Sequence, residues 1–281
     1  MADTTARISI NISLANAEME RWLRPAAGMP DVLLSAMRHA VFPGGKRLRP
    51  VLLLATAEAF GTPAEQATGP AAAVELVHCY SLVHDDLPSM DNDDFRRGRP
   101  TVHSLYGEAM ALLAGDALLT LAFEVLAATG RSHSQALVHE LASAIGARGM
   151  VGGQARELLM EGRLDRNGLL AVHAGKTGAL IRAAVRMGAV AAGTSLESTE
   201  MERLTVFAEN LGLAFQVTDD LLDLPKDAAS GRTTLATLLG EQGARRMAAE
   251  VTETAIRALV FLGGRGDFLK SLAIQQLDRR A

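Results

Sequence analysis

The sequence predicts an all-α protein, and three observations support that prediction. Eight of the nine prolines lie within the first hundred residues, which leaves residues 101–224 free of proline. This long segment is rich in alanine, leucine, methionine, glutamate and arginine, which all favour helix. Apolar residues recur in it at helical spacing, as in ALLAGDALLTLAFEVLAAT, and the sequence contains no alternating strand pattern. We therefore expect long helices that are packed on several sides.

Clusters of glycine, proline and small polar residues mark the boundaries of these helices. We expect turns at residues 42–46, 61–63, 98–100, 130–132, 161–168, 192–198 and 225–232. The sequence contains no linker, internal repeat or heptad array, and 48% of its 281 residues are hydrophobic, which is enough for a large core. We therefore expect residues 1–281 to form a single domain.

The charge and cysteine content argue against several classes of protein. A formal net charge of -4 and a pI near 6.0 argue against a general nucleic-acid binder, so local basic segments should bind small anions. The single cysteine, Cys79, excludes an internal disulfide framework and favours a reducing compartment. The N-terminus lacks a basic start followed by an apolar core, and no apolar run reaches membrane-spanning length without a charge. We expect a cytoplasmic protein without a membrane span.

The most informative segment is HDDLPSMDNDDFRRGRPT, residues 84–101, which contains five aspartates and three arginines. Asp85 and Asp86 end an apolar helical segment, and Pro88 interrupts the backbone hydrogen bonds just beyond them. Asp91 follows about a turn and a half later. Carboxylates this close repel one another unless a cation lies between them, and Mg²⁺ prefers such ligands together with phosphate oxygens. A solvated charged loop is the competing interpretation.

A second acidic segment, FQVTDDLLD at residues 215–223, strengthens the prediction of a metal site. In a helix its polar side chains share one face, because they are spaced by three and four residues: Gln216, Asp219, Asp220 and Asp223. Three like charges on one stripe of an otherwise apolar helix destabilise one another, so they suit metal ligands better than a solvated face. Two such segments, more than a hundred residues apart, predict a cluster of Mg²⁺ ions between facing helices that holds a diphosphate from both sides.

Basic side chains near the first acidic segment fit a phosphorylated ligand. Arg96 and Arg97 carry guanidinium groups, which are permanently charged and bind phosphate through two hydrogen bonds at once. A second basic segment, GGKRLRP at residues 44–50, follows a glycine turn at an expected helix start, where an anion is favoured; its basic residues are Lys46, Arg47 and Arg49. His78 lies seven residues before Asp85 and therefore on nearly the same helix face. A core histidine is the competing interpretation of His78.

Taken together, five motifs resemble the trans-isoprenyl diphosphate synthases, and within that family the bacterial farnesyl diphosphate synthases. They are GGKRLRP, ELVHCYSLVHDDLPSMDNDDFRRGRPT, GGQARELL, GKTGALIRAAVRMGA and GLAFQVTDDLLD, and they lie between about residue 43 and residue 223. The resemblance implies an all-α helical bundle of the isoprenoid synthase type around a central active-site cavity, usually in a homodimer. It also implies a Mg²⁺-dependent, head-to-tail condensation of isopentenyl diphosphate with an allylic diphosphate, either dimethylallyl or geranyl diphosphate.

The same resemblance assigns roles to individual residues. The metal ligands would be Asp85, Asp86 and Asp91 of the first segment and Asp219, Asp220 and Asp223 of the second. Isopentenyl diphosphate would be bound by Lys46, Arg49, His78 and Arg97. The allylic diphosphate would be bound by Arg96, and the groups beside that diphosphate and the developing cation would be Lys176, Thr177 and Gln216.

Two residues about one helical turn before the first aspartates are expected to set the length of the product. A growing chain would extend from Asp85 down the preceding helix, so Tyr80 and Ser81 should limit the depth of its cavity. In the resembling family, an aromatic residue five positions before the first aspartate is typical of enzymes that stop at fifteen carbons. We expect farnesyl diphosphate as the main product, with geranylgeranyl diphosphate as the alternative. A core tyrosine is the competing interpretation of Tyr80.

One departure from the family pattern follows the second acidic segment. Family members commonly have a longer loop there, with lysines and a Thr-Tyr-Pro element, whereas this chain has LPKDAASGRTTLATLLG. Lys226 or Arg232 would have to supply the missing positive charge. Two other functions remain open on this basis. The short loop favours a non-catalytic subunit of a prenyl synthase, although the two intact aspartate segments oppose it. A terpene cyclase would need no isopentenyl diphosphate site and would not be expected to carry the DDLLD sequence.

Overall fold

The computed structural model describes residues 2–42, 44–130, 133–160 and 165–277, and these form an almost entirely helical chain. In order, the elements are α1 (Ala2–Trp22), α2 (Asp31–Val41), α3 (Leu48–Ala59), η1 (Ala64–Gln66), α4 (Thr68–Asp85), β1 (Phe95–Arg96), β2 (Arg99–Pro100), α5 (Val102–Tyr106), α6 (Glu108–Ala128), α7 (Ser134–Ile145), α8 (Met150–Leu159), α9 (Arg166–His173), η2 (Ala174–Gly178), α10 (Ala179–Ala191), α11 (Thr199–Ser230), α12 (Leu235–Ala258), η3 (Val260–Gly266) and α13 (Asp267–Leu277). The predicted all-α fold is confirmed.

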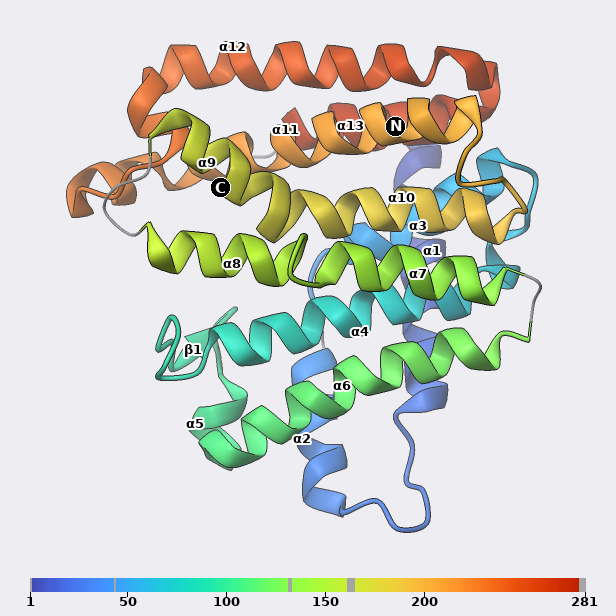
Figure 1. Ribbon diagram of the computed structural model, residues 1–281, viewed down its shortest axis with the longest axis vertical. Coiled ribbons are helices and arrows are strands. Elements are labelled where there is room, and N and C mark those ends of the chain that lie inside the picture. The colour runs from blue at the N-terminus through green and yellow to red at the C-terminus, as the bar shows by residue number, and fades with distance from the viewer. Residues whose placement is uncertain (1, 43, 131–132, 161–164, 278–281) are drawn as a thin grey trace.

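Most of the long helices lie side by side in roughly parallel rows (Figure 1). Helix α4 packs against α1, α3, α6 and α10, and α10 in turn packs against α3, α7 and α11. Helix α12 lies along α11 at one edge of the stack. Because α10 contacts both α4 and α11, it lies between the two helices that carry the aspartate-rich segments.

Apolar side chains of the central helices form one large buried cluster, in which Leu76 of α4 and Leu180 of α10 are fully buried. Alanine is frequent in both helices, and its small side chain lets helix axes approach closely. A second, smaller cluster joins α9, α11 and α12 through Leu169, Val217 and Leu235. The second aspartate-rich segment is therefore supported by a separate patch of core from the first.

Residues that favour helix ends fix the boundaries around the second aspartate-rich segment. The side chain of Ser198 accepts a hydrogen bond from the amide of Met201 and caps the start of α11. At the other end Gly231 adopts a left-handed conformation with φ of 73°, which glycine tolerates without strain. Helix α12 then begins with a reciprocal capping box between Thr234 and Thr237. Residues 231–234 are thus the whole connection between the two helices.

The structure corrects several predicted boundaries. Residues 225–230 are helical, because α11 continues through Pro225 until Gly231 ends it, so the predicted turn is confined to the end of that range. Residues 166–168 form the first turn of α9, which Asp165 caps by accepting from the amide of Gly168 at 2.7 Å. The predicted turn at residues 98–100 belongs to a small β-hairpin, in which β1 pairs antiparallel with β2, and the sequence analysis did not anticipate any strand.

The remaining turn predictions agree with the structure where they can be compared. Residues 61–63 and 192–198 lie outside the α-helices, between α3 and η1 and between α10 and α11. The described parts of ranges 42–46 and 130–132 are also non-helical. Residues 43, 131–132 and 161–164 lie outside the described residues.

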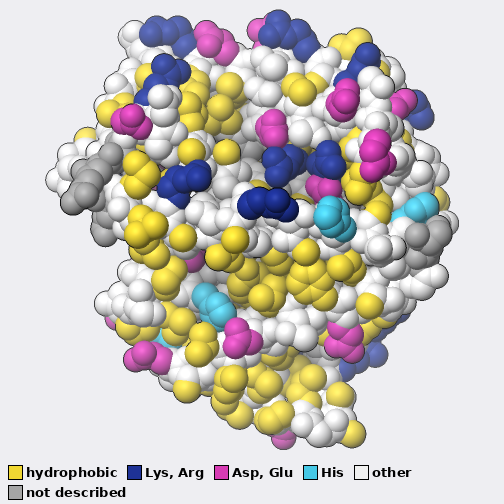
Figure 2. Space-filling model, in the orientation of Figure 1, with side chains coloured by type: hydrophobic (Ala, Val, Ile, Leu, Met, Phe, Trp, Pro, Cys, Tyr) yellow, Lys and Arg dark blue, Asp and Glu magenta, His cyan; other side chains and the backbone are white. Residues whose placement is uncertain are grey.

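Helix α6 is unusually apolar for a helix that is partly at the surface. By length and composition it is the one described helix that could cross a membrane, a test that core helices of soluble proteins also pass, and 39% of its most apolar 18 residues are buried. One side packs against α4, whereas Leu112 and Leu113 are 48% and 52% exposed. Figure 2 shows apolar side chains gathered across the middle of the face where α6, α7 and α8 lie in front. This patch has no partner within the described chain.

Candidate active site

The first aspartate-rich segment forms the end of α4 and a tight loop beyond it. Helix α4 ends at Asp85, and the amide of Asp91 donates to the carbonyl oxygen of Asp85 (2.8 Å), which returns Asp91 to the helix end. Burial raises the pKa of Asp85 to about 6; the charge of Lys176 opposes this shift and the charge of Asp91 adds to it. Asp85 therefore faces a like charge from its own loop and a cation from a distant segment.

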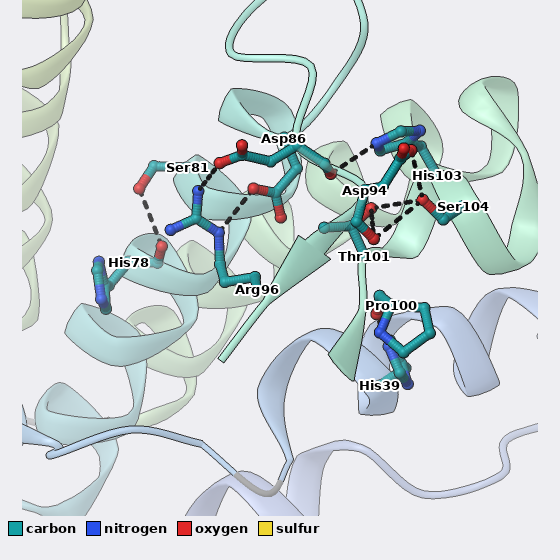
Figure 3. A network of polar contacts seen from close by, with 11 residues as sticks. His39, His78, Ser81, Asp86, Asp94, Arg96, Pro100, Thr101, His103 and Ser104 are labelled. Carbon is teal, nitrogen blue, oxygen red and sulfur yellow. Dashed lines mark hydrogen bonds and ion pairs between the residues drawn. The ribbon is translucent and has the colours of Figure 1, made fainter. Parts of the chain in front are cut away.

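Asp86 points towards the hairpin and is engaged there by Arg96. The carboxylate is 4% exposed and accepts a hydrogen bond from Nε of Arg96 at 2.6 Å, while Nη2 of Arg96 reaches Asp93 at 3.3 Å (Figure 3). Burial raises the pKa of Asp86, and the bond from Arg96 opposes that shift. To bind a diphosphate as predicted, Arg96 must exchange these carboxylates for phosphate oxygens.

A basic cluster, defined as Arg49, His78 and Arg97, lies next to this segment. Burial lowers the pKa of Arg49. Burial also lowers the pKa of His78 well below its ordinary value, and the charges of Arg49 and Arg97 add to that shift, so the imidazole is neutral. Nε of Arg49 is buried without a hydrogen-bond partner in the described chain. An anion here would satisfy that donor and offset the repulsion between the guanidinium groups.

The conformation of Arg97 depends on the glycines of the GGKRLRP segment. Arg97 has a φ of 54°, which is a strained, left-handed conformation for a residue with a side chain. Its guanidinium packs over Gly45, where a Cβ would lie 2.5 Å from the guanidinium carbon. A glycine at position 45 therefore leaves the space that Arg97 occupies. Lys46, the other predicted member of this site, is exposed.

Arg47 has a different role from its basic neighbours, although it lies in the same motif. It is 3% exposed, and Nη1 forms an ion pair with Glu75 at 2.8 Å. Nη2 donates to the carbonyl oxygen of Val41, and Nε donates to the side chain of Asn16 at 3.0 Å. All of these partners are protein groups, so Arg47 ties the start of α3 to α1, α2 and α4 rather than being available to a ligand.

Lys176 and Thr177 lie on η2, a π-helical turn between α9 and α10. π-turns are rare and occur frequently at functional sites. Helix α8 packs directly against η2, because Gly153 and Gly175 bring the two backbones into contact and leave no room for a Cβ on either residue. The GGQARELL and GKTGALIRAAVRMGA motifs therefore meet at this contact, which holds Lys176 near Asp85.

Glu157 is a site residue to which the sequence analysis gave no role. Nζ of Lys176 forms an ion pair with Glu157 at 2.7 Å, and Nη2 of Arg232 lies 3.8 Å from the same carboxylate. Arg232, from the short connection before α12, thus reaches the site, whereas Lys226 is exposed on α11. The glutamate within GGQARELL could have been recognised as a partner for Lys176, but sequence spacing gives no direct sign of a contact between α8 and η2.

The second aspartate-rich segment is fixed partly by α12. Asp220 is 6% exposed, and its carboxylate accepts a hydrogen bond from the amide of Leu235 at 2.9 Å and another from Gln216. Burial raises the pKa of Asp220 to about 6, and these bonds oppose the shift. Asp219 is partly buried and its charge acts on Arg49, so α11 contributes to the field of the basic cluster. Asp223 is exposed.

His173 is a second site residue that sequence reasoning missed. Its Nε2 lies 3.8 Å from Asp220 and is buried without a hydrogen-bond partner in the described chain. Burial lowers the pKa of His173 to about 4, so the ring is neutral near pH 7. The only sequence signal was its position in the turn before Lys176.

Tyr80 and Ser81, the predicted determinants of product length, lie about one turn before Asp85 on α4. Tyr80 is 6% exposed, and its ring meets the ring of His84 edge-on at 5.7 Å. Burial raises the pKa of Tyr80 to about 12, and the charge of Asp85 adds to this shift. Ser81 donates to the carbonyl oxygen of His78, so its hydroxyl is engaged by its own helix. Tyr80 is thus a buried side chain about one turn before the first aspartate.

The carboxylates that could hold a metal ion lie in two groups, here called half-sites, rather than in one complete metal centre. Within the described residues, no group of three or more His, Cys, Asp or Glu side chains lies close enough to hold a metal ion. Mg²⁺ typically takes only one or two protein carboxylates and completes its shell with water and substrate phosphates. Asp85 and Asp91 fit that requirement, because burial and the charge of Asp91 already disfavour the ionised form of Asp85 and a cation would reverse this. Asp219 and Asp223 offer the second half-site.

Comparisons with known proteins agree with this arrangement. Residues 30–236 match the family model of the polyprenyl synthetases. The chain is 41% identical to farnesyl diphosphate synthase of Escherichia coli over 296 aligned positions, covering 99% of this chain and 95% of that protein. It is also 41% identical to a chloroplastic geranylgeranyl pyrophosphate synthase of Capsicum annuum, covering 91% and 72% of the two chains. A solved FPP/GFPP synthase from Zymomonas mobilis superposes with a TM-score of 0.90 at 37% identity, covering 98% and 99% of the chains.

A helical bundle with two aspartate-rich segments, a basic cluster and these relatives defines the class of protein, an all-α enzyme of trans-prenyl transfer. The chain belongs to the polyprenyl synthetase family and is a short-chain prenyltransferase. The family, fold class and enzyme class that the motifs predicted are confirmed.

Proposed function

We propose that this enzyme condenses isopentenyl diphosphate head-to-tail with dimethylallyl and then geranyl diphosphate, in a Mg²⁺-dependent reaction that gives mainly farnesyl diphosphate. The observation that carries the proposal is the basic cluster, in which Nε of Arg49 is unsatisfied, beside two carboxylate half-sites. A buried, partnerless guanidinium donor and a neutral histidine among arginines form a suitable site for one diphosphate. Asp85, together with the charge of Lys176 that acts on it, suits the second diphosphate.

The reaction requires two diphosphates to be held differently. Arg49, Arg97 and Lys46 would bind the diphosphate of the isopentenyl substrate, which remains attached throughout. Lys176 and Arg96 would bind the allylic diphosphate, whose carbon–oxygen bond breaks and which leaves with the electron pair. Positive charge that interacts more strongly with the departing diphosphate than with the bound ester lowers the barrier to ionisation.

The remaining steps form the new carbon–carbon bond. The double bond of isopentenyl diphosphate attacks the allylic cation, and loss of a proton from the resulting cation restores a double bond. The departing diphosphate is a suitable acceptor for that proton. Water would quench the cation, so apolar side chains around the site must exclude it. Mg²⁺ held by Asp85, Asp91 and Asp219 would neutralise charge on the allylic diphosphate.

Product length rests on Tyr80, which is buried one turn before Asp85. A large side chain at that depth would stop a chain growing from the first segment down α4, which favours fifteen carbons over twenty. Relatives named as a farnesyl and as a geranylgeranyl synthase both share 41% identity with this chain over most of its length, so geranylgeranyl diphosphate is the alternative product. Incubation of the purified protein with Mg²⁺, isopentenyl diphosphate and dimethylallyl diphosphate tests the proposal. A main product of fifteen carbons would support it, whereas no diphosphate release would refute it.

We also propose that the enzyme is a homodimer that works in the cytoplasm. The observation that supports a dimer is the exposed apolar side of α6, which includes Leu112 and Leu113 and could pack against a second copy of the chain. Exposed apolar side chains that gather in this way are typical of an interaction surface. The buried, unpaired Cys79 is compatible with a reducing compartment. Sedimentation of the protein and of Leu113→Glu tests the dimer, because a charge in a symmetric interface is met twice and should shift the variant to monomer.

A further inference from the structure

The β1–β2 hairpin that carries Arg96 and Arg97 is attached to the rest of the protein by polar contacts at its two ends. On one side the amide of Thr101 and the hydroxyl of Ser104 donate to the carbonyl oxygen of Asp94, and His103 contacts the carbonyl oxygen of Asp93 (Figure 3). On the other side His39, in the last turn of α2, lies 2.8 Å from the carbonyl oxygen of Pro100 (Figure 3). The hairpin is thus held by α5 and by α2.

The contacts of His39 define its tautomer. A carbonyl oxygen can only accept, so Nε2 of His39 carries the proton and donates to Pro100. A guanidinium can only donate, so Nδ1 of His39 accepts from Nη2 of Arg99 at 3.2 Å. Arg99 also donates through Nη1 to the carbonyl oxygen of Phe42 at 2.8 Å, and the ring of Tyr106 meets the histidine ring edge-on at 6.0 Å. One neutral histidine therefore bridges both residues of β2.

The hairpin is not closely packed against α2 and α4. A cavity of about 170 Å³ separates them, and its walls include His39, Phe42, Val83, Arg97 and Arg99. Where a void replaces packing atoms, the polar contacts at its edge determine how the segment sits. Arg97 moreover adopts a strained conformation, with φ of 54°, and such strain persists only where the surroundings enforce it.

We propose that His39 is a positioning residue for the isopentenyl diphosphate site, because it fixes β2 through Pro100 and Arg99 and so holds the Arg97 guanidinium over Gly45. His39 itself does not contact the substrate. The inference rests on the proposed function, since it assumes that Arg97 binds the isopentenyl diphosphate. It adds a residue, outside the family motifs singled out in the sequence, that controls the affinity of that site.

The decisive variant is His39→Phe, which keeps the ring and its contact with Tyr106 but removes both hydrogen bonds. We expect the apparent KM for isopentenyl diphosphate to rise roughly three- to tenfold, the effect of losing one or two ordinary hydrogen bonds. The kcat and the KM for the allylic substrate should stay within about twofold. His39→Gln, which retains a donor for Pro100, should restore part of the affinity. The control is His139→Phe, at an exposed position on α7, which should change nothing.

A double-mutant cycle tests whether His39 and Arg99 act together. Arg99→Met keeps the chain length but loses both donors, so it should raise the same KM, and His39→Phe/Arg99→Met should be little worse than the more severe single variant. Fully additive effects would show that His39 and Arg99 do not act together on β2, and an unchanged KM in His39→Phe would overturn the proposed role of His39.

Arg97→Ala distinguishes a failure of the positioning inference from a failure of the proposed substrate site. If Arg97→Ala leaves the KM for isopentenyl diphosphate unchanged, the proposed substrate site fails. If only the His39 variants are silent, the positioning inference alone fails.

Discussion

The two aspartate-rich segments carry similar residues but are built in opposite ways. The first lies where a helix stops, and its geometry depends on an irregular loop, the return of Asp91 to Asp85, and an arginine hairpin. The second lies inside the long helix α11, where the helical repeat sets the spacing of its carboxylates and one amide of α12, that of Leu235, fixes Asp220. The difference shows that a regular helix sets most of this geometry by itself, whereas a helix end needs a network of tertiary contacts to do so.

Removal of one carboxylate from each segment should give the largest effect. Asp85→Asn and Asp219→Asn should each lower kcat by roughly 100-fold or more, the scale of losing a main electrostatic contributor in the transition state. Steady-state rates at saturating Mg²⁺ measure this, with Asp31→Asn, at an exposed position in the first turn of α2, as the control. Near-normal turnover in Asp219→Asn would contradict a catalytic role for the second segment, because the first segment would then be sufficient for the reaction.

The same pair of variants separates the segments by stability. The folded pKa of Asp85 is about 6 and its ordinary value is 3.8, so ionisation at pH 8 costs the folded protein stability. Asp85→Asn should therefore stabilise the metal-free protein by about 1 to 3 kcal/mol at pH 8, as measured by urea unfolding. A loss of stability would show that the carboxylate is needed for the loop rather than strained within it.

Arginines that differ in their protein partners should respond differently. Arg49 has an unsatisfied Nε, whereas Arg96 is bound to Asp86 and Asp93. Arg49→Gln should raise the KM for isopentenyl diphosphate roughly 10- to 100-fold, because it removes charge-assisted contacts worth about 1.5 to 3 kcal/mol. Arg96→Gln should act on the allylic substrate instead. Equal effects of both changes on both substrates would contradict the assignment of two separate diphosphate sites.

Acid should lower the free energy of unfolding through His173, which lies next to Asp220 of the second segment. The unfolded chain binds a proton at His173 as the pH falls through 6.5, whereas the folded chain does not until about pH 4. Stability from this group is therefore lost as the pH falls from 6.5 towards 4. Relative to His173→Asn, the wild-type protein should lose about 2 kcal/mol of unfolding free energy between pH 7 and pH 5. Parallel curves for the two proteins would refute the buried, neutral state, and His139→Asn is the exposed control.

The smallest effect concerns product length rather than rate. Tyr80→Ala should open space beneath the first segment and shift the product from fifteen towards twenty carbons, with kcat changed by no more than a few fold. Chromatography of the dephosphorylated products measures the distribution. Tyr80→Phe keeps the volume and should preserve the wild-type product, and an unchanged distribution in Tyr80→Ala would mean that another side chain limits the chain.

Sequence periodicity predicted the regular parts of this enzyme well. The spacing predicted a helix through Gln216, Asp219, Asp220 and Asp223, and α11 confirms that helix. The start of α3 follows from the glycine turn before it. Contacts between distant segments have no such signature. The sequence did not show that Arg47 is buried against Glu75 whereas Lys46 is exposed, because both are basic residues at the same helix start.

The missed site residues have the same explanation. Glu157 and Lys176 meet because two glycines let α8 touch η2, and a packing contact of this kind depends on the whole fold. The continuation of α11 through Pro225 was missed because proline usually ends a helix, whereas the glycine six residues later provides the actual stop. The hairpin was missed because each strand has only two residues, too few for a pattern to form.

The π-turn η2 also makes the chain sensitive to a change in length between α9 and α10. A π-turn holds one residue more than the α-helical turn that it replaces, so it acts as a built-in insertion. Removing Ala174 would let α9 and α10 fuse into one regular helix, and all side chains on one side of the junction would rotate by roughly 100° relative to the other. His173 could then no longer face Asp220 while Lys176 faces Glu157. We therefore expect that an insertion or deletion at this junction would disrupt one of these two contacts.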